Sequence, residues 1–260
     1  MKNSIIGIIP AKMESKNFPN KPMADILGMP MIGHVYNRAR LCTDFSDVYV
    51  ATADKEIIDY ITSIGGKVIE IVESRISATD RVAEAVKRIE TDNNCVYDLV
   101  VSIQPDEPML TPDVLGRAIS PMVMDKKLKM TALMTEITSE EIFNDRNEIK
   151  VVADNLNNAM YLSREPIPSK SRGVCFPRMK LVGIDVFRRR FLNEFNLMLP
   201  TPLEVAEDID LNRILENGMR IKMTLTEQEM LAVNHPQELE TVISRMRQDE
   251  YFLRQYMDKF

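Results

Sequence analysis

The sequence predicts an α/β fold: a mixed, mostly parallel sheet with helices on both faces. Short apolar runs typical of buried strands alternate with longer amphipathic segments typical of helices, and Gly, Pro and Asn mark the turns between them. The alternation continues through most of the 260 residues, with no internal repeat, low-complexity linker or sharp change of composition. We therefore expect a three-layer αβα arrangement in one domain, residues 1–260, with a hairpin elaboration around residues 130–200.

The first half shows the alternation most clearly. Gly65-Gly66 suits the end of the second helix. Thr79 and Asp80 suit the start of the third helix, and Pro112 suits the first turn of the fourth. The expected strands span residues 4–9, 47–51, 67–71 and 98–103, and the expected helices span 31–40, 55–64, 78–89 and 112–124.

The second half is less regular. The polar run 155–158 is a strong turn signal, so the strands on either side of it should form a hairpin. Asn217-Gly218 suits the end of a helix, and residues 188–190, three arginines, suit a solvated helix start. The expected strands span residues 130–136, 148–152, 159–163, 180–186 and 220–225, and the expected helices span 203–216 and 235 to the end.

Composition narrows the class of protein. A net charge of -6 argues against nonspecific binding to nucleic acid or to acidic membranes, since both need a basic face. The early apolar run 5–9 is too short to span a bilayer and lacks the flanks of a secretion signal. The three cysteines show neither metal-type nor redox-type spacing. We expect a cytoplasmic protein without nucleic-acid partners or membrane insertion.

Zinc chemistry is not expected. His34 and His235 are the only histidines, and neither lies in a zinc-binding pattern. His34 falls within the apolar pattern of the helix 31–40, which favours a packed or capping role over a catalytic one.

The segment 98–108 carries the strongest chemical signal. The apolar strand 98–103 delivers Gln104, Asp106 and Glu107 into a proline-bounded turn. In an open α/β sheet, ligands bind at the carboxyl ends of strands, and a carboxylate there can hold Mg²⁺ against a substrate phosphate. An acidic surface turn is the alternative.

The loop after the first strand, residues 10–22, is polar and contains Lys12, Lys16 and Lys21. A nucleoside triphosphate carries about four negative charges, and spaced lysines with free backbone N–H groups can cradle it. A solvated basic loop is the alternative interpretation. The chain contains neither the GxxxxGK[ST] loop nor the GxGxxG fingerprint.

Eight sequence motifs occur in this chain in the same order as in one known family. The chain resembles the 3-deoxy-manno-octulosonate (Kdo) cytidylyltransferases, also called CMP-Kdo synthetases, from about Ile8 to about Val242. The motifs are PAKxxSxxxPxKP (10–22), GMPMI (28–32), SATDR (77–81), QPDEP (104–108), DRNEIK (145–150), YLSR (161–164), IP (167–168) and PLE (202–204).

The resemblance implies a nucleotidyltransferase of GT-A-like architecture that works as a homodimer with Mg²⁺ as cofactor. Its partners would be CTP and an acidic sugar. In the implied reaction, the anomeric hydroxyl of the sugar acid attacks the α-phosphorus of CTP and pyrophosphate leaves. The product would serve lipopolysaccharide or capsule biosynthesis, and residues around 130–200 would serve dimerisation and sugar binding.

The resemblance also assigns roles to single residues of this chain. Lys21, Gln104 and Asp106 would be catalytic, and Asp106 and Asn234 would bind the metal. Gln104, Arg164 and Asp210 would bind the sugar, with Arg164 at its carboxylate. The residues that would bind the nucleotide are Pro10, Ala11, Lys12, Ser15, Lys21, Ser77, Asp80, Arg81 and Gln104.

On the nucleotide side, the chain departs from the family pattern. Lys12 and Asn17 stand where arginine is usual. A planar guanidinium with five N–H donors is thus replaced by a compact ammonium group at one position and a neutral amide at the other. Ala78 and Pro105 stand where glycine is usual, and Pro105 has no backbone N–H. Asn234 replaces an aspartate and brings no charge. A second interpretation therefore stays open: a catalytically degenerate paralogue acting as a nucleotide-binding regulatory or assembly subunit.

The sugar side diverges further. Leu181 stands where the family has histidine, and Asp210-Leu211 where it has a Glu-Gln pair. We therefore expect a relative of Kdo or of the nine-carbon ulosonic acids rather than Kdo itself. Asp208 and Asp210 resemble the paired aspartates of sialate-type cytidylyltransferases. An acidic first turn that complements the helix dipole is the alternative.

Overall fold

The structure is a computed structural model that describes residues 3–15, 17–72, 77–169, 176–228, 230–250 and 254–255. The chain divides into two compact units, Met1–Gly116 with Met230–Phe260, and Arg117–Glu229. The expectation of a single domain with an elaboration stays a prediction. Lys16 and Cys175 lie outside the described residues.

The first unit is built on a parallel sheet. Its strands lie in the order β6, β1, β4, β5, and each pairs in parallel with its neighbour. Every residue of β1 and β6 is buried, as the apolar runs predicted. The strands are β1 (Ile5–Pro10), β4 (Asp47–Thr52), β5 (Val68–Glu70) and β6 (Leu99–Ile103).

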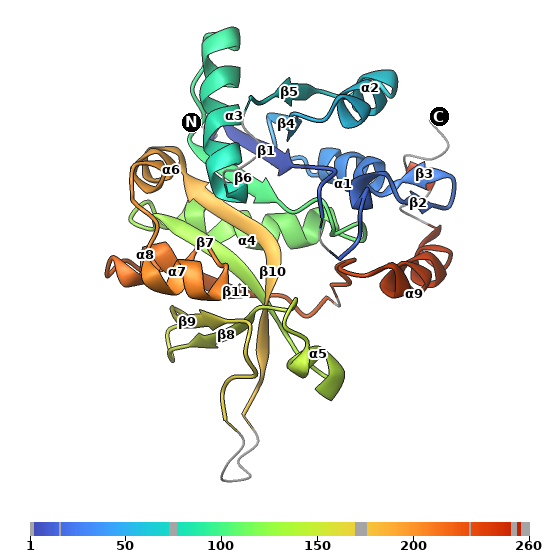
Figure 1. Ribbon diagram of the computed structural model, residues 1–260. Helices are drawn as coiled ribbons and strands as arrows, with labels where there is room; N and C mark the ends of the chain where they lie inside the picture. The colour runs from blue at the N-terminus through green and yellow to red at the C-terminus, as the bar shows by residue number, and fades with distance from the viewer. Residues whose placement is uncertain are drawn as a thin grey trace. The chain divides into compact units, whose positions relative to one another are not determined.

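The strand order fixes where the helices of this unit lie. The chain passes from β1 to β4 to β5 in one direction and then returns past β1 to β6 (Figure 1). Right-handed crossovers therefore place α1 and α2 on one face of the sheet and α3 on the other. The order reverses between β1 and β6, which is where ligands bind in such sheets. The helices are α1 (Met31–Arg40), α2 (Lys55–Ser63), α3 (Ala78–Asn93) and α4 (Pro112–Met124), which begins in this unit.

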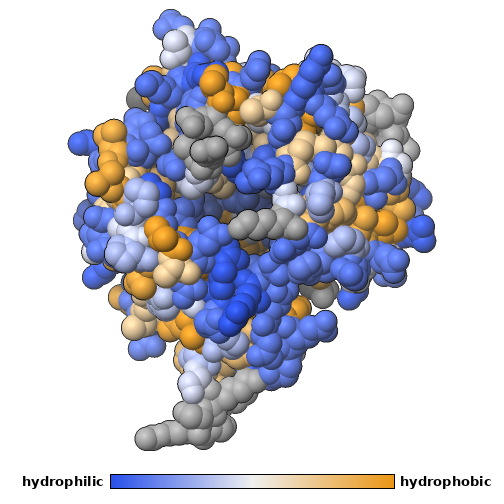
Figure 2. Space-filling model, viewed as in Figure 1, coloured by the Kyte–Doolittle hydropathy of each residue, from blue (hydrophilic) through white to orange (hydrophobic). Residues whose placement is uncertain are grey.

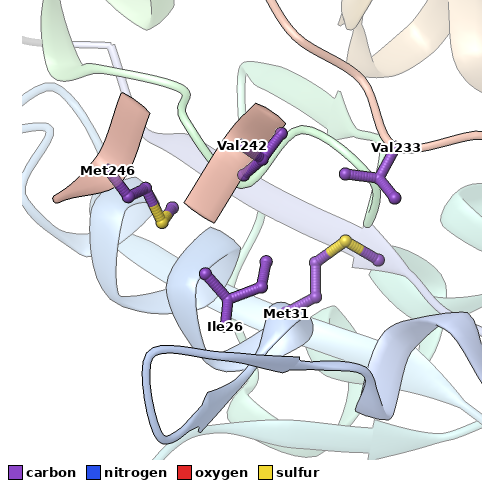
Figure 3. Packing of buried hydrophobic residues seen from close by; sticks show 5 residues of the cluster. All are labelled: Ile26, Met31, Val233, Val242 and Met246. Carbon is purple, nitrogen blue, oxygen red and sulfur yellow. The ribbon is translucent and has the colours of Figure 1, made fainter. Parts of the chain in front are cut away.

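An apolar cluster joins the two chain segments that make up the first unit. Val233, Val242 and Met246 pack against Ile26 and Met31 (Figure 3). The elements that contribute are β2 (Asp25–Ile26), α1 and α9 (Pro236–Met246), and β2 pairs antiparallel with β3 (Met29–Pro30). The helix predicted from residue 235 begins as expected, but α9 ends at Met246; residues 251–253 and 256–260 lie outside the described part.

The second unit carries a mixed sheet. Strand β7 pairs antiparallel with β10 and parallel with β11. Strands β8 and β9 form the predicted antiparallel hairpin, and β8 also pairs with β10. The strands are β7 (Met130–Glu136), β8 (Lys150–Ala153), β9 (Ala159–Ser163), β10 (Met179–Arg188) and β11 (Lys222–Leu225). The helices are α5 (Glu140–Asn144), α6 (Arg189–Asn196), α7 (Pro202–Glu207) and α8 (Asn212–Glu216).

The prediction of one helix over residues 203–216 was wrong. The helix breaks into α7 and α8 at Asp208, whose backbone is left-handed with φ of 53°. Ile209 and Leu211 are both buried, at 3% and 2% exposure. Residues two apart on one continuous helix point in different directions, so the break allows both to reach the core.

The surface of the described residues mixes polar and apolar groups. Hydrophilic side chains predominate on the face drawn in Figure 2, with smaller apolar groups between them. Among the described helices, none combines the length and the apolar character needed to cross a membrane.

His34 has the packed role that its sequence context predicted. It is fully buried in α1, and its Nε2 donates to the carbonyl oxygen of Ile26 at 2.7 Å. Burial lowers the pKa of His34 to about 4. The imidazole is therefore neutral near pH 7, so it acts in packing and as a hydrogen-bond donor.

This burial predicts a specific loss of stability in acid. An unfolded histidine has a pKa of about 6.5, so between pH 6.5 and 4 the unfolded chain binds more protons at this position than the folded chain. Lowering the pH from 7 to 5 should therefore reduce the free energy of unfolding by about 2 kcal/mol through His34 alone. Urea unfolding at both pH values, compared between the native protein and His34→Gln, measures this difference. An identical pH dependence in both proteins would contradict it.

Candidate active site

Two loops leave the sheet of the first unit at its switch point, which is the place between β1 and β6 where the strand order reverses. Strands β1 and β6 are paired in parallel, with Ile8 opposite Ser102. Their carboxyl ends therefore lie at the same edge. The loop 11–22 follows β1 and the turn 104–108 follows β6, so the two segments singled out by the sequence start side by side.

Lys21 and Asp106 join these two loops. Lys21 Nζ donates to Asp106 Oδ2 at 2.6 Å, and the two side chains are 14% and 20% exposed. Neither group is sealed in the core, so both can still exchange their partner for a ligand. The structure thus brings together two predicted catalytic residues, one for anionic phosphates and one for a cation, with Gln104 directly after β6.

Backbone contacts hold Lys21 in this position. Asn20 has a left-handed backbone, φ 59°, which turns the chain into a single 3-10 turn, Lys21–Met23. The Lys21 N–H donates to the carbonyl oxygen of Phe18, and Phe18 packs against the apolar cluster of Figure 3. Farther back, the Met13 N–H donates to Asp54 Oδ2 at 2.8 Å. These contacts fix the backbone that carries Lys21.

Asn234 also reaches this edge. The Val233 N–H donates to the backbone oxygen of Asp106 at 2.9 Å, and Val233 is fully buried in the apolar cluster. The Asn234 and His235 N–H groups both donate to Glu238 Oε2, which caps the start of α9. The chain thus places the two predicted metal ligands, Asp106 and Asn234, on hydrogen-bonded neighbouring segments.

The donors at this point fit Mg²⁺. Asp106 offers carboxylate oxygens and Asn234 offers an amide oxygen, and hard cations prefer oxygen ligands. Mg²⁺ is commonly bound through one or two carboxylates and completed by substrate phosphates and water. Among the described residues, no group of three or more His, Cys, Asp or Glu side chains could hold a metal ion. Asp106 and Asn234 would therefore share such an ion with substrate phosphates and water.

The other residues predicted for the nucleotide have structural contacts of their own. Ser77 and Asp80 form a capping box at the start of α3, with Ser77 Oγ donating to Asp80 Oδ2 at 2.9 Å. Arg81 is 7% exposed. Ser15 Oγ accepts from the Phe18 N–H at 3.4 Å. The role of each in nucleotide binding stays a prediction.

The last residue of β1 and the two residues after it are divided between core and surface. Pro10 ends the strand and is buried, and Ala11 is 1% exposed, with its N–H donating to the Ala51 carbonyl oxygen at 2.9 Å. Lys12 is half-exposed and lies 3.9 Å from Glu14. Lys12 is therefore a surface cation, in contrast to the more buried Lys21.

In the second unit, Arg164 binds backbone oxygens. Its guanidinium donates to the carbonyl oxygens of Glu207 at 2.7 Å, Asp208 at 3.0 Å and Arg146 at 3.1 Å. These three hydrogen bonds leave part of the five-donor fork for a ligand. They orient the guanidinium at the α7–α8 connection, which also carries Asp210. The contact of Arg164 with a sugar carboxylate stays a prediction.

Glu207 anchors this arrangement. Its carboxylate accepts from the Arg164 N–H, Ser163 Oγ and Tyr161 Oη, all within 2.9 Å. Burial alone would raise the pKa of Glu207, but these hydrogen bonds together lower it. The side chain of Asp208 is 95% exposed, and its pairing with Asp210 stays a prediction.

Replacing Glu207 by Gln should lower the free energy of unfolding by about 1–2 kcal/mol, because an amide oxygen cannot accept all three hydrogen bonds. Urea unfolding measures the change. Asp208→Asn is the matched control, since it removes an exposed charge and asparagine tolerates a left-handed backbone. Equal effects of the two substitutions would contradict the anchoring role.

The sequence analysis missed Asp185. This acid lies in β10, which is otherwise mostly apolar and buried. The available signal was a single charge between Ile184 and Val186 in a predicted strand. Such a residue is rarely buried without a partner.

Comparisons with known proteins agree with these features. The family model described as cytidylyltransferase matches residues 6–221. A 3-deoxy-manno-octulosonate cytidylyltransferase of Geobacter metallireducens is 37% identical, over 93% of this chain and 97% of its own. An 8-amino-3,8-dideoxy-manno-octulosonate cytidylyltransferase of Shewanella pealeana is 36% identical, over 93% and 98%.

Among solved structures, that of a CMP:2-keto-3-deoxy-manno-octonic acid synthetase complexed with CTP superposes with a TM-score of 0.85. It is 31% identical in sequence, and the match covers 95% of this chain and 99% of that one. The predicted α/β nucleotidyltransferase fold is thereby confirmed.

Proposed function

The chain belongs to the cytidylyltransferase family, among the 3-deoxy-manno-octulosonate cytidylyltransferases, and from this premise we propose how it acts. It transfers the CMP group of CTP to the anomeric hydroxyl of Kdo or of a related ulosonic acid and releases pyrophosphate. The observation that carries the proposal is the Lys21–Asp106 pair at the switch point of the parallel sheet. It puts a cation for the triphosphate and a carboxylate for a metal where such a sheet binds its ligand.

The chemistry asks for positioning and charge neutralisation rather than covalent catalysis. Both substrates are anions, so their approach is opposed by repulsion. Lys21 binds triphosphate oxygens and stabilises the charge that gathers on the departing pyrophosphate. Gln104 hydrogen-bonds at the reacting centre, and Arg164 holds the sugar carboxylate so that the hydroxyl lies in line.

Asp106 and Asn234 are the residues that would hold Mg²⁺. When bound, the ion neutralises phosphate charge and makes the α-phosphorus more open to attack. Replacement of the family's aspartate by Asn234 leaves one carboxylate in this pair, so we expect metal affinity to depend strongly on CTP. The enzyme is further expected to be a cytoplasmic homodimer. Exposed apolar side chains of α7 and of the connection between α6 and α7 are available for such contact, namely Leu197, Leu199, Leu203 and Val205.

A coupled pyrophosphate assay tests the function. The purified protein is supplied with CTP, UTP or ATP, with Mg²⁺, and with a panel of ulosonic acids. The proposal predicts pyrophosphate release that requires CTP, a sugar acid and Mg²⁺ together. CTP binding without turnover on any sugar acid would instead favour the degenerate paralogue.

A further inference from the structure

Lys150 is a fully buried lysine that takes no direct part in the proposed reaction. The motif DRNEIK, residues 145–150, connects α5 to β8 and ends with Lys150, the first residue of β8 (Figure 1). Lysine is almost never buried completely unless it is paired, because its ammonium group must then be served by acceptors of the protein. A lysine kept at such a position binds a specific part of the fold.

The ammonium group of Lys150 binds the backbone of the turn that precedes it. Its Nζ donates to the carbonyl oxygen of Asp145 at 2.7 Å and to that of Glu148 at 2.6 Å. In the chain, these two carbonyl groups lie on either side of Arg146 and Asn147. A single side chain thus closes this turn from both ends.

Two side-chain contacts support the same turn. The Asn147 N–H donates to Asp145 Oδ1 at 2.8 Å. From β10, Lys180 Nζ donates to Glu148 Oε2 at 3.0 Å in an ion pair that is largely buried. Both contacts use carboxylate oxygens, whereas Lys150 binds the backbone itself. The path of the backbone through the turn 145–148 therefore depends on Lys150.

This turn carries an acceptor that orients Arg164. The carbonyl oxygen of Arg146 accepts from Arg164 Nη1 at 3.1 Å. The other two backbone acceptors of the guanidinium, Glu207 and Asp208, both belong to the end of α7. Without the contact to Arg146, the guanidinium would be held from the α7 side alone and could tilt.

Strand pairing brings the turn and Arg164 together. Lys150 lies opposite Ser163 in the antiparallel pair of β8 and β9, and Arg164 follows Ser163 directly. The segment that contains the turn and the segment that contains the arginine therefore leave the same end of this hairpin. A displacement of the turn is passed on to Arg164 over a short distance.

We propose that Lys150 is a positioning residue for the sugar acid: it holds the turn 145–148 so that the Arg146 carbonyl group keeps Arg164 directed at the sugar carboxylate. This inference rests on the proposed function, in which Arg164 binds that carboxylate. A planar guanidinium binds a carboxylate through two parallel hydrogen bonds, so a tilt of its plane weakens both. The residues proposed for the triphosphate lie on other segments of the chain, so the effect should concern the sugar acid and not CTP.

The test measures both substrates in Lys150→Met. Methionine fills the same buried space but cannot donate to the two carbonyl oxygens. Pyrophosphate release with Mg²⁺ is followed at varied Kdo and at varied CTP; if the native protein prefers another ulosonic acid of the panel, that acid replaces Kdo. The expected result is a fall of about tenfold or more in kcat/KM for Kdo, with KM for CTP within a factor of about two. Lys150→Gln retains an N–H donor and should lose less.

A double-mutant cycle shows whether Lys150 acts through Arg164. Arg164→Lys keeps a positive charge but lacks the planar fork, so it should itself lower kcat/KM for Kdo by about tenfold or more. In that background, Lys150→Met should cost less than about a further factor of two, because the contact that it supports is already lost.

Thr131→Val is the matched control. It removes another buried hydrogen bond of the second unit, from Thr131 Oγ1 to the carbonyl oxygen of Ala118 at 2.8 Å. The substitution should lower stability but keep the native kinetic constants for both substrates, which separates a general loss of stability from the loss of a positioned guanidinium.

The possible outcomes are distinct. Native kcat/KM for Kdo in Lys150→Met, an equal loss toward Kdo and CTP, or full additivity with Arg164→Lys would each overturn the inference and leave the proposed function standing. Native kinetics of Arg164→Lys would overturn the role of Arg164 and the inference with it. Absence of turnover by the native protein on every ulosonic acid would overturn the proposed function itself. Thermal melting shows whether each variant is folded, and if Lys150→Met is not, Lys150→Gln decides by the same contrast between Kdo and CTP.

Discussion

Replacing Asp106 by Asn is expected to lower kcat for pyrophosphate release by about 10²–10³-fold. The amide keeps the size of the side chain but removes the single carboxylate that the Asp106–Asn234 pair offers to Mg²⁺. It also removes the ionic partner of Lys21, which lies 2.6 Å away. Initial rates at saturating CTP and sugar acid measure the loss, and thermal melting shows whether the fold is kept.

Asp113→Asn is the matched control for this substitution. Asp113 is exposed in the first turn of α4, in the same unit and seven residues farther along the chain. Its replacement should leave kcat within a factor of about two, since surface substitutions of this kind have small effects. Turnover of Asp106→Asn close to that of the control would refute the role assigned to Asp106.

Replacing Lys21 by Met is expected to lower kcat/KM for CTP by about 10²-fold. Methionine retains most of the aliphatic length but cannot bind triphosphate oxygens or offset the charge on the leaving pyrophosphate. The unpaired Asp106 carboxylate then adds repulsion against the nucleotide. Steady-state kinetics with varied CTP concentration measure the change, and a loss in kcat as well as a rise in KM is expected.

The control is Lys55→Met, which removes an exposed cation at the start of α2. Its effect on CTP kinetics should be small and should fade as salt is added. If Lys21→Met and Lys55→Met behave alike, Lys21 contributes only to the general charge of the surface, and its assigned contact with the triphosphate is wrong.

The periodic segments of the fold could be predicted from sequence because local pattern and tertiary packing agree there. The helix 31–40 was predicted with the bounds of α1, and the strand 130–136 with those of β7. The helix 203–216 failed for a physical reason. Its composition suits a helix, but burial of both Ile209 and Leu211 requires the break at Asp208. That requirement comes from contacts distant in sequence, which periodicity does not contain.

The candidate site shows the same contrast between local sequence pattern and contacts distant in sequence. The loop that contains Lys21 and the turn that contains Asp106 could be predicted to lie at one edge, because each follows a strand and parallel strands bring their carboxyl ends together. The roles expected of the two residues came from the family resemblance. Asn234 is distant in sequence from both. The hydrogen bond from Val233 to Asp106 that brings it there has no signature in the local pattern. Glu207 is one of several acids in the predicted helix 203–216, and the local pattern does not indicate that its carboxylate accepts from the Arg164 N–H.

Metal binding tests the central claim most directly, because it does not depend on the identity of the sugar. Binding of Mn²⁺ as a stand-in for Mg²⁺ is measured by electron paramagnetic resonance, with and without CTP, for the native protein and for Asp106→Asn. We predict that CTP strengthens Mn²⁺ binding to the native protein and that Asp106→Asn weakens this ternary binding by about tenfold or more. Equal Mn²⁺ affinity of the two proteins in the presence of CTP would contradict the account.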